Sequence, residues 1–153
     1  MMDYIDKTIL NILQENDKLS YHKIAKMLRM SASTIHSRVK KMKQNGIIKR
    51  FCAVIEPQKV GFNSMAIIGL TVDANKMREA ANVLSLYKEV QIVSTSTGDH
   101  DLIVLIIAKD EKSLWRFINQ KVKTIEGINS RMDVSSFIDV YKFNQAIKFT
   151  IAD

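Results

Sequence analysis

The sequence predicts an α+β protein in which three helices precede a domain of alternating strands and helices. Apolar residues recur at helical spacing through the first third of the chain, whereas short apolar runs alternate with amphipathic stretches in the remainder. The charge divides at the same place. Residues 1–50 hold eleven Lys and Arg against four Asp and Glu, a net charge of +7, and residues 51–153 hold twelve of each. This division predicts a segment that binds a polyanion, joined to a neutral domain with another role.

Composition is ordinary for a soluble globular protein, since 46% of the 153 residues are hydrophobic and 25% are charged. The single cysteine, Cys52, excludes an internal disulfide, and no Cys/His cluster indicates structural zinc. Small domains without such supports often gain buried area by oligomerisation, which we therefore expect. The sequence shows no apolar run of signal-peptide or membrane-spanning length. We expect a cytoplasmic protein with no membrane partner.

Two helices are predicted before residue 30. Asp3, followed by Asp6 three residues later, resembles a capping box with Asp in place of the usual Glu. Asn16 and Asp17 end this helix, and Ser20 is a good N-cap for the next. The residues expected to face the core are Ile5, Ile9, Ile12, Leu13, Ile24, Ala25, Met27 and Leu28.

A third helix is predicted from the N-cap Ser31 to about residue 45, with Gly46 as its terminator. A short turn precedes it, so the second and third helices form a helix–turn–helix. Hydroxyl side chains near the start of such a helix approach base edges in the major groove, and lysines and arginines further along meet phosphates. The residues expected to contact DNA are Ser31, Ser33, Thr34, Ser37, Arg38, Lys40 and Lys41. Binding is expected to weaken steeply with salt.

Two other interpretations of the basic helix remain. It is also compatible with the solvated face of a three-helix bundle that binds nothing. A helix lying on a membrane surface is disfavoured, because the apolar stripe is narrow, has no Trp or Phe, and is needed for the bundle core. The agreement of the cap, the short turn and the localised charge favours DNA binding.

Residues 46–62 are predicted to leave the bundle as a strand and a loop, which turns at Glu56 and Pro57. We therefore expect a DNA-binding domain at 1–50, a linker strand or hinge at 51–63 and a second domain at 64–153. The second domain is predicted as a ferredoxin-like βαββαβ fold with both helices on one face of its sheet. Because strands one and three are apolar on both faces, a second subunit is the natural cover for the other face. The predicted strands are 65–72, 90–97, 102–108 and 128–142.

The order of residues along nearly the whole chain resembles the Lrp/AsnC family of "feast/famine" transcription regulators. The resemblance implies a winged helix–turn–helix followed by a ferredoxin-like domain that binds ligand and dimerises. It further implies dimers that assemble into tetramers or octamers on pseudo-palindromic double-stranded DNA, with small effectors, usually amino acids, bound between dimers. The residues that carry it are Asp6, Ile9, Leu10, Leu13, Ile24, Ala25, Leu28, Ser31, Ile35, Arg38, Val39, Met42, Gly46, Ile47, Ile48, Ala53, Pro57, Val60, Gly61 and the run Thr97-Gly98-Asp99-His100-Asp101-Leu102.

The turn at residues 97–101 has one glycine and two carboxylates, which suits the binding of a zwitterionic amino acid. Backbone N–H groups around its glycine can meet the α-carboxylate, and an aspartate can meet the α-ammonium group. The alternative is that these residues only form a hairpin turn and bind nothing. The family resemblance disfavours this alternative. We expect no metal site, because adjacent Asp-His-Asp side chains rarely converge on one ion. The residues expected at the effector site are Thr97, Gly98, Asp99, His100, Asp101, Asp133 and Ser135.

The chain departs from the family pattern at two places. Arg29 stands where the family usually has Gly before the recognition helix. An Arg in the left-handed conformation costs on the order of 1 kcal/mol and adds a basic group. Arg131 and Asp133 stand where the family often has a Thr-x-Thr pair, so the effector chemistry is expected to differ from the common pattern or to be lost.

Two other functions are alternatives to that of a regulator. Some relatives of the family are haem-pathway decarboxylases, which would need clustered His and Arg in the second domain. Residues 51–153 offer one His and three scattered Arg, and no catalytic residues are expected. A chromatin-like architectural protein is the other alternative, and it would bind bulk DNA without an effector response.

Overall fold

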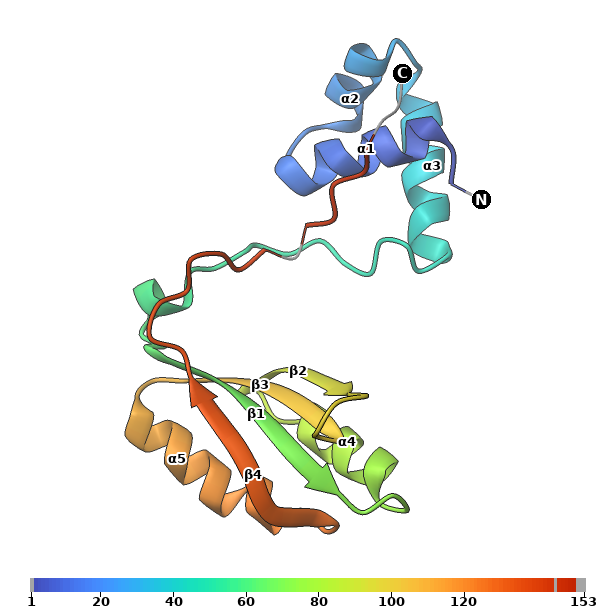
Figure 1. Cartoon of the computed structure of the whole chain (residues 1–153). Coiled ribbons are helices and arrows are strands. Elements are labelled where there is room, and N and C mark those ends of the chain that lie inside the picture. The colour runs from blue at the N-terminus through green and yellow to red at the C-terminus, as the bar shows by residue number, and fades with distance from the viewer. Residues whose placement is uncertain (1, 145, 151–153) are drawn as a thin grey trace. The chain divides into compact units, whose positions relative to one another are not determined.

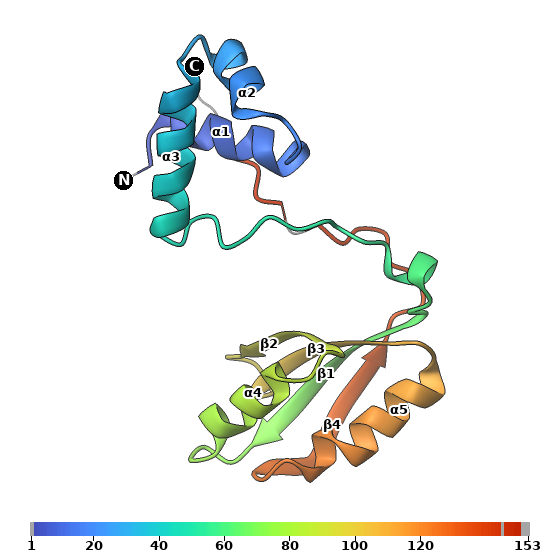
Figure 2. The ribbon, with the colours of Figure 1, turned by 180° about the vertical axis from the view of Figure 1, so that it is seen from behind.

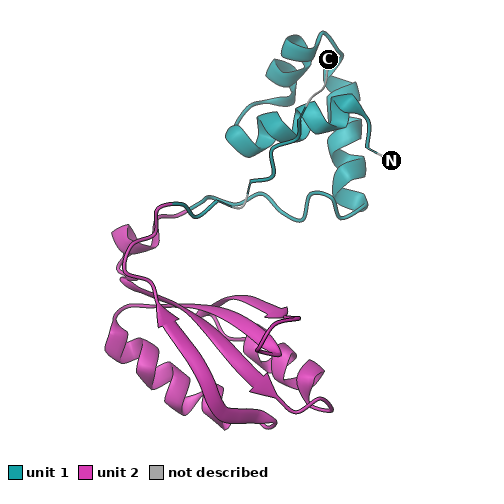
Figure 3. Ribbon diagram, in the orientation of Figure 1, with its two compact units in different colours: residues 1–54, 142–153 teal, residues 55–141 magenta. Residues whose placement is uncertain are grey.

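A computed structural model describes residues 2–144 and 146–150 of the chain. The chain divides into two compact units, each of which is described by itself (Figure 3). The first unit comprises Met1–Val54 together with Lys142–Asp153, and the second comprises Ile55–Tyr141.

Three helices form the first unit: α1 (Tyr4–Glu15), α2 (Tyr21–Leu28) and α3 (Ala32–Gln44) (Figure 1). The predicted capping box is confirmed, because the Asp3 carboxylate accepts the Asp6 N–H at 2.8 Å and the Asp6 carboxylate accepts the Asp3 N–H at 3.3 Å. The predicted N-caps Ser20 and Ser31 are confirmed as well. Gly46 follows α3 with φ of 70°, as expected for a helix terminator.

The helical core follows the predicted apolar stripes, except that it gains Leu10 and loses Met27. Its buried residues are Ile9, Leu10, Leu13, Ile24, Ala25, Ile35, Val39 and Met42. The prediction for Met27 was wrong, because this side chain is 60% exposed. The eight-residue helix α2 packs on the core through Ile24 and Ala25 and, one helical turn later, through Leu28, and position 27 lies outside that narrow stripe.

The C-terminal segment packs on α1. Phe149 contacts the helical core, and the backbones of Ile147 and Phe149 are hydrogen-bonded to the side chains of Gln14 and Asn11. Residues 142–150 therefore belong to the first unit, whereas the sequence-based division assigned them to the second. The sequence gives no local signal for this return, because the contacts join residues more than 130 positions apart.

The strand predicted within the linker is not formed among the described residues. Residues 49–56 are extended but pair with no strand among the described residues, and a short 3₁₀ turn, η1 (Pro57–Val60), follows. Val54 is 92% exposed and Ile55 61% exposed. The alternation of side chains is present, but the ladder partner that would make this segment a strand is absent from that part of the chain.

The second unit has the predicted ferredoxin-like order of elements. It contains β1 (Ser64–Val72), α4 (Met77–Ser85), β2 (Val90–Thr95), β3 (Leu102–Ala108), α5 (Glu111–Gln120), the 3₁₀ turn η2 (Val122–Thr124) and β4 (Ile128–Ser136). The strands form one antiparallel sheet in the order β2-β3-β1-β4. The strand β4 ends at Ser136 and is shorter than predicted, because the last ladder contact with β1 is the hydrogen bond of 2.8 Å from the Phe137 N–H to the Met65 carbonyl and residues 138–144 form no strand.

Both helices cover one face of the sheet (Figure 2). The covered face contributes alternate residues of β1 and β3, among them Ile68, Leu70 and Val104, to the buried core. The other face presents the residues between them. In the register of β1 and β3, Met65 lies opposite Ile107, Ile67 opposite Leu105, and Gly69 opposite Ile103. The second face is thus largely apolar and has no covering layer within the described part of the chain.

Candidate nucleic-acid interface and ligand site

The start of α3 is organised by the hydroxyl of Ser31. This Oγ accepts the N–H of Thr34 at 3.1 Å and lies 2.7 Å from the Thr34 Oγ1 and 2.8 Å from the Ser33 Oγ. The helix therefore begins with three linked hydroxyl groups. Because Ser31 is bound into the cap, its role within the chain is to begin the helix.

The remaining predicted contact residues divide between two faces of α3. Ser33, Ser37, Lys40 and Lys41 are exposed, and they recur every three or four residues on the side of the helix away from its buried stripe. Thr34 and Arg38 are half-buried. The structure thus brings two hydroxyls and two lysines together on one solvent-facing strip of α3.

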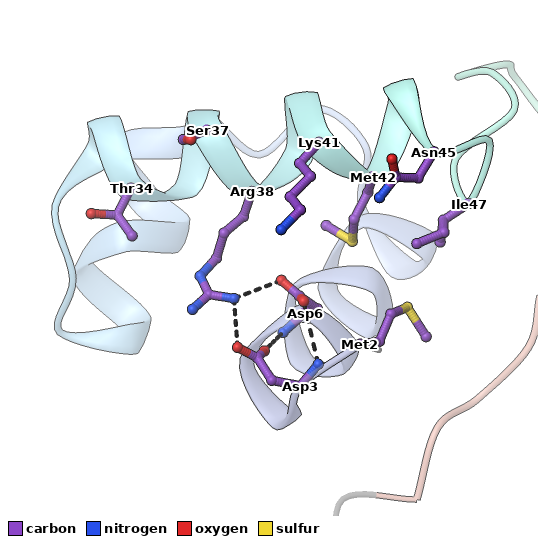
Figure 4. A pocket seen from close by; sticks show the side chains of 10 residues that line it. All are labelled: Met2, Asp3, Asp6, Thr34, Ser37, Arg38, Lys41, Met42, Asn45 and Ile47. Carbon is purple, nitrogen blue, oxygen red and sulfur yellow. Dashed lines mark hydrogen bonds and ion pairs between the residues drawn. The ribbon is translucent and has the colours of Figure 1, made fainter.

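Arg38 points at the beginning of α1 (Figure 4). Its Nη1 donates to Asp3 Oδ2 at 2.7 Å and to Asp6 Oδ1 at 2.8 Å. The hydrogen bond to Asp6, followed by that to Asp3, raises the pKa of the guanidinium. Sequence reasoning assigned Arg38 to a phosphate and missed this pair, although two acids near the N-terminus of a basic segment were a visible signal.

A hollow of about 570 Å³ lies between α3 and the beginning of α1 (Figure 4). Thr34, Ser37 and Lys41 line it from α3, and the two aspartates that bind Arg38 line it from α1. Two carboxylates beside one arginine leave no excess positive charge from that cluster, so a phosphate would find its cation at Lys41. The hollow is therefore a poor anion site by itself.

The turn between α2 and α3 contains Arg29 in the left-handed conformation, with φ of 53° and ψ of 44°. It is the only non-glycine residue with positive φ within residues 2–144 and 146–150. Its N–H donates to the carbonyl groups of Ala25 and Lys26, which ends α2 as a glycine would. The chain thus places an arginine in a conformation that favours glycine, at the cost of local strain.

The loop between β2 and β3 uses two of its predicted ligand groups for its own structure. The carboxylate of Asp101 accepts the N–H of Val72 at 2.8 Å. The N–H of Gly98 donates to the Ser96 Oγ at 3.1 Å. Asp101 therefore fixes the loop to the end of β1, and the Gly98 N–H is already occupied. This differs from the expected roles of both residues toward an effector.

His100 lies against the uncovered face of the sheet. Its Nε2 is 3.0 Å from Asp133 Oδ2 on β4, and its ring packs over Gly69 on β1, where a Cβ atom would overlap with the imidazole. The buried Nδ1 has no hydrogen-bond partner among the described residues. Sequence reasoning missed Gly69, although a glycine inside an apolar strand commonly marks the close approach of another group.

The other predicted effector residues are arranged around this pair. Ser135 lies two residues beyond Asp133, on the same face of β4, and both are exposed. Thr97 and Asp99 are exposed on the loop itself. The structure therefore joins His100 and Asp133 directly and leaves the hydroxyl and carboxylate groups around them open to solvent.

A metal centre would need several converging ligands, and no group of three or more His, Cys, Asp or Glu side chains fits one within the described ranges. No helix in that part of the chain is long and apolar enough to cross a membrane. The face of α3 and the surroundings of His100 and Asp133 therefore offer hydrogen bonds and ion pairs to a ligand.

Comparison with known proteins matches both units to families. Residues 2–49 match the family model of winged helix-turn-helix DNA-binding domains, and residues 65–147 match the Lrp/AsnC ligand binding domain. An uncharacterized HTH-type transcriptional regulator of Pyrococcus furiosus is 40% identical over 149 residues, covering 97% of this chain and 100% of that protein. The regulator FL11 of the same organism is 39% identical over 128 residues, 84% of each chain.

Solved structures give the same result. Escherichia coli AsnC superimposes with a TM-score of 0.88 at 28% identity, covering 97% of this chain and 99% of that chain. A transcriptional regulator of Neisseria meningitidis, solved in complex with L-Met, has a TM-score of 0.87 at 23% identity over 96% of each chain, a likeness in fold. The sequence and fold together identify the protein: the chain belongs to the Lrp/AsnC family of DNA-binding transcription regulators.

Proposed function

We propose that the chain regulates transcription by reading specific DNA sequences with α3 in the major groove. The observation that carries this proposal is the exposed strip of α3, in which Ser33 and Ser37 precede Lys40 and Lys41. Hydroxyls approach base edges, and the lysines contact phosphates on either side of the groove. Thr34 lies beside the strip and adds a hydroxyl, while Arg38 acts from behind by fixing α3 to α1.

The operator is proposed to be pseudo-palindromic because two copies pair through the uncovered face of the sheet. That face presents Met65, Ile67, Ile103 and Ile107 around the buried Leu105. Its apolar character and the absence of net charge from residues 51–153 support self-association, since a neutral face does not repel its own copy. Dimers are proposed to assemble further into tetramers or octamers, as the family's members do.

An amino acid is the proposed effector, bound beside His100 and Asp133. Exposed carboxylates at Asp99 and Asp133 suit its α-ammonium group, and Thr97 and Ser135 offer hydroxyls. The L-Met bound to the Neisseria meningitidis regulator supports an amino acid of some kind. The Lrp/AsnC ligand binding model, which matches this unit, supports the same class of ligand.

The DNA proposal is tested with a duplex carrying the upstream region of the chain's own gene and a shuffled duplex of equal length. We expect tight binding of the first duplex, footprints spaced by one helical turn, and an affinity that falls steeply between about 50 and 200 mM salt. Equal affinity for both duplexes would overturn sequence-specific recognition and favour an architectural protein.

The effector proposal is tested by measuring thermal unfolding of the full chain with each of the twenty amino acids in turn. A ligand that binds the native state alone raises the transition temperature by mass action. An increase that is lost in Asp133→Asn supports the site. The absence of an increase for all twenty would overturn the amino-acid effector and leave the DNA proposal untouched.

A further inference from the structure

Two side-chain amides on α1 hold the backbone of the C-terminal segment. The Asn11 amide donates to the Phe149 carbonyl at 3.0 Å and accepts the Phe149 N–H at 3.0 Å. The Gln14 amide donates to the Ile147 carbonyl at 2.8 Å and accepts the Ile147 N–H at 2.7 Å. Each amide thus forms a reciprocal pair of hydrogen bonds, as a neighbouring strand would.

The spacing of the two partners explains why this pairing is possible. Residues three apart on a helix lie about 5–6 Å from each other on its surface. Alternate residues of an extended chain lie about 6.5–7 Å apart and direct their N–H and C=O groups to the same side. The two spacings are similar, so Asn11 can pair with Phe149 while Gln14 pairs with Ile147. The ring of Phe149 also packs on the helical core, which adds an apolar anchor to the four hydrogen bonds.

The segment starts from a fixed point in the second unit. Glu111, at the beginning of α5, accepts hydrogen bonds from the Ser64 hydroxyl at 2.9 Å and from the Ser136 hydroxyl at 3.0 Å. Ser64 begins β1 and Ser136 ends β4, so these two residues are the first and last of the sheet along the chain. One carboxylate therefore ties together the start of β1 and the end of β4, from which the chain leads to the helical unit in both directions.

We propose that the Asn11–Gln14 surface is a docking site for this chain's own C-terminal segment, and that docking gives the DNA-binding unit a second connection to the sheet unit. The first connection is the extended linker, residues 49–56, which alone would leave the helices free to reorient. Docking closes the chain into a loop with two connections and so reduces the freedom of the DNA-binding unit. The strand β4 carries Asp133 and ends at Ser136, and the chain that follows it reaches the docked residues Ile147 and Phe149, so docking links the sheet unit to α1 through the chain.

The test replaces one backbone donor in the full chain. Ile147→Pro removes the N–H that Gln14 accepts and leaves every helix residue unchanged. Lys148→Pro is the matched control, because alternate N–H groups point away from α1 and this substitution removes only an exposed contact with Glu15 at 3.4 Å. Amide exchange by NMR reports docking, and relaxation of the two units reports whether they reorient together.

We expect the Phe149 amide of the unaltered chain to exchange at least about tenfold more slowly than an unstructured amide. Ile147→Pro should remove that protection and let the helical unit reorient faster than the sheet unit, whereas Lys148→Pro should change neither. Asn11→Asp, which keeps the acceptor and loses the donor, should weaken the protection while core amides such as that of Ile24 stay protected. Unprotected Phe149 in the unaltered chain, or equal effects of the two prolines, would overturn the proposal.

Discussion

Arg38 of α3 and Asp6 of α1 form an ion pair of 2.8 Å that joins the recognition helix to the first helix of the unit. The side chains are 27% and 17% exposed, so solvent screens the pair less than it would a fully exposed one. The same guanidinium contacts Asp3, whose carboxylate caps α1. Arg38 therefore fixes α3 to the beginning of α1.

Breaking this pair is expected to destabilise the helical unit. In a double-mutant cycle with Arg38→Met and Asp6→Asn, we expect a coupling energy of about 1 kcal/mol from denaturant unfolding, since the pair is partly buried and hydrogen-bonded. The single variant Asp6→Asn should also weaken DNA binding, although Asp6 carries the charge that DNA repels. Tighter binding by that variant would show that Asp6 merely sequesters Arg38 from DNA.

The stability of the helical unit is expected to depend on Asp3 in acid. The hydrogen bond from the Asp6 N–H, followed by the Arg38 guanidinium, lowers the pKa of Asp3 below its ordinary value of 3.8. A lowered pKa in the folded state means that the unfolded chain binds the proton first, so this contribution is complete above the ordinary value and is lost as pH falls through the lowered one. Unfolding measured between about pH 5 and pH 3 should show a smaller loss in Asp3→Asn than in the unaltered chain. Parallel curves for the two proteins would contradict this assignment.

Relieving the strain at Arg29 is expected to stabilise the chain. A non-glycine residue in the left-handed region destabilises the folded state by roughly 1–2 kcal/mol. A glycine there removes this strain but loses more chain entropy on folding, which offsets about 0.5–1 kcal/mol of the gain. Arg29→Gly should therefore raise the free energy of unfolding by about 0.5–1 kcal/mol. The matched control is Arg116→Gly, in the exposed interior of α5, where the same change should destabilise by about 1 kcal/mol. Destabilisation by both substitutions would refute the strain.

Gly69 is expected to be required for the position of His100. A methyl group at residue 69 overlaps with the imidazole, so Gly69→Ala should displace the ring from Asp133 and destabilise the second unit by about 1–3 kcal/mol. Gly98→Ala is the control, because its Cβ would meet only the Ser96 Oγ at an ordinary 3.5 Å. The imidazole carbon resonances of His100 report the displacement, and identical spectra for both variants would count against it.

The lysines of α3 are expected to set the salt dependence of DNA binding. Each phosphate contact contributes about 0.9 to the slope of log affinity against log salt, so Lys40→Gln and Lys41→Gln should each lower the slope by about one. Lys88→Gln, an exposed position of the second unit, should leave it unchanged. Fluorescence anisotropy across a salt series gives the slopes. An unchanged slope for both α3 variants would remove these lysines from the phosphate contacts.

The local elements could be predicted from the sequence because their causes are local. Asp3, Ser20 and Ser31 each cap a helix by accepting the N–H three residues further on, and the composition of Leu102–Ala108 predicts a buried strand. The linker could not be predicted, because a strand needs a partner and alternation alone supplies none. The burial of Met27 was predicted wrongly for a related reason, since the width of a buried stripe depends on the neighbouring helices.

The sequence by itself determined the division of the chain into two parts: a basic helical unit with a hydroxyl-and-lysine face, and a neutral unit in which strands alternate with helices. These follow from periodicity, caps and charge, which act over a few residues. Only the tertiary structure decided that Arg38 pairs with Asp3 and Asp6, that His100 lies on Gly69 beside Asp133, and that residues 147–149 return to α1. Each of these joins groups at least thirty positions apart, where the packing of whole elements selects the partner. The sequence marks Gly69 and the two N-terminal acids as unusual, but it does not show which residue each one contacts.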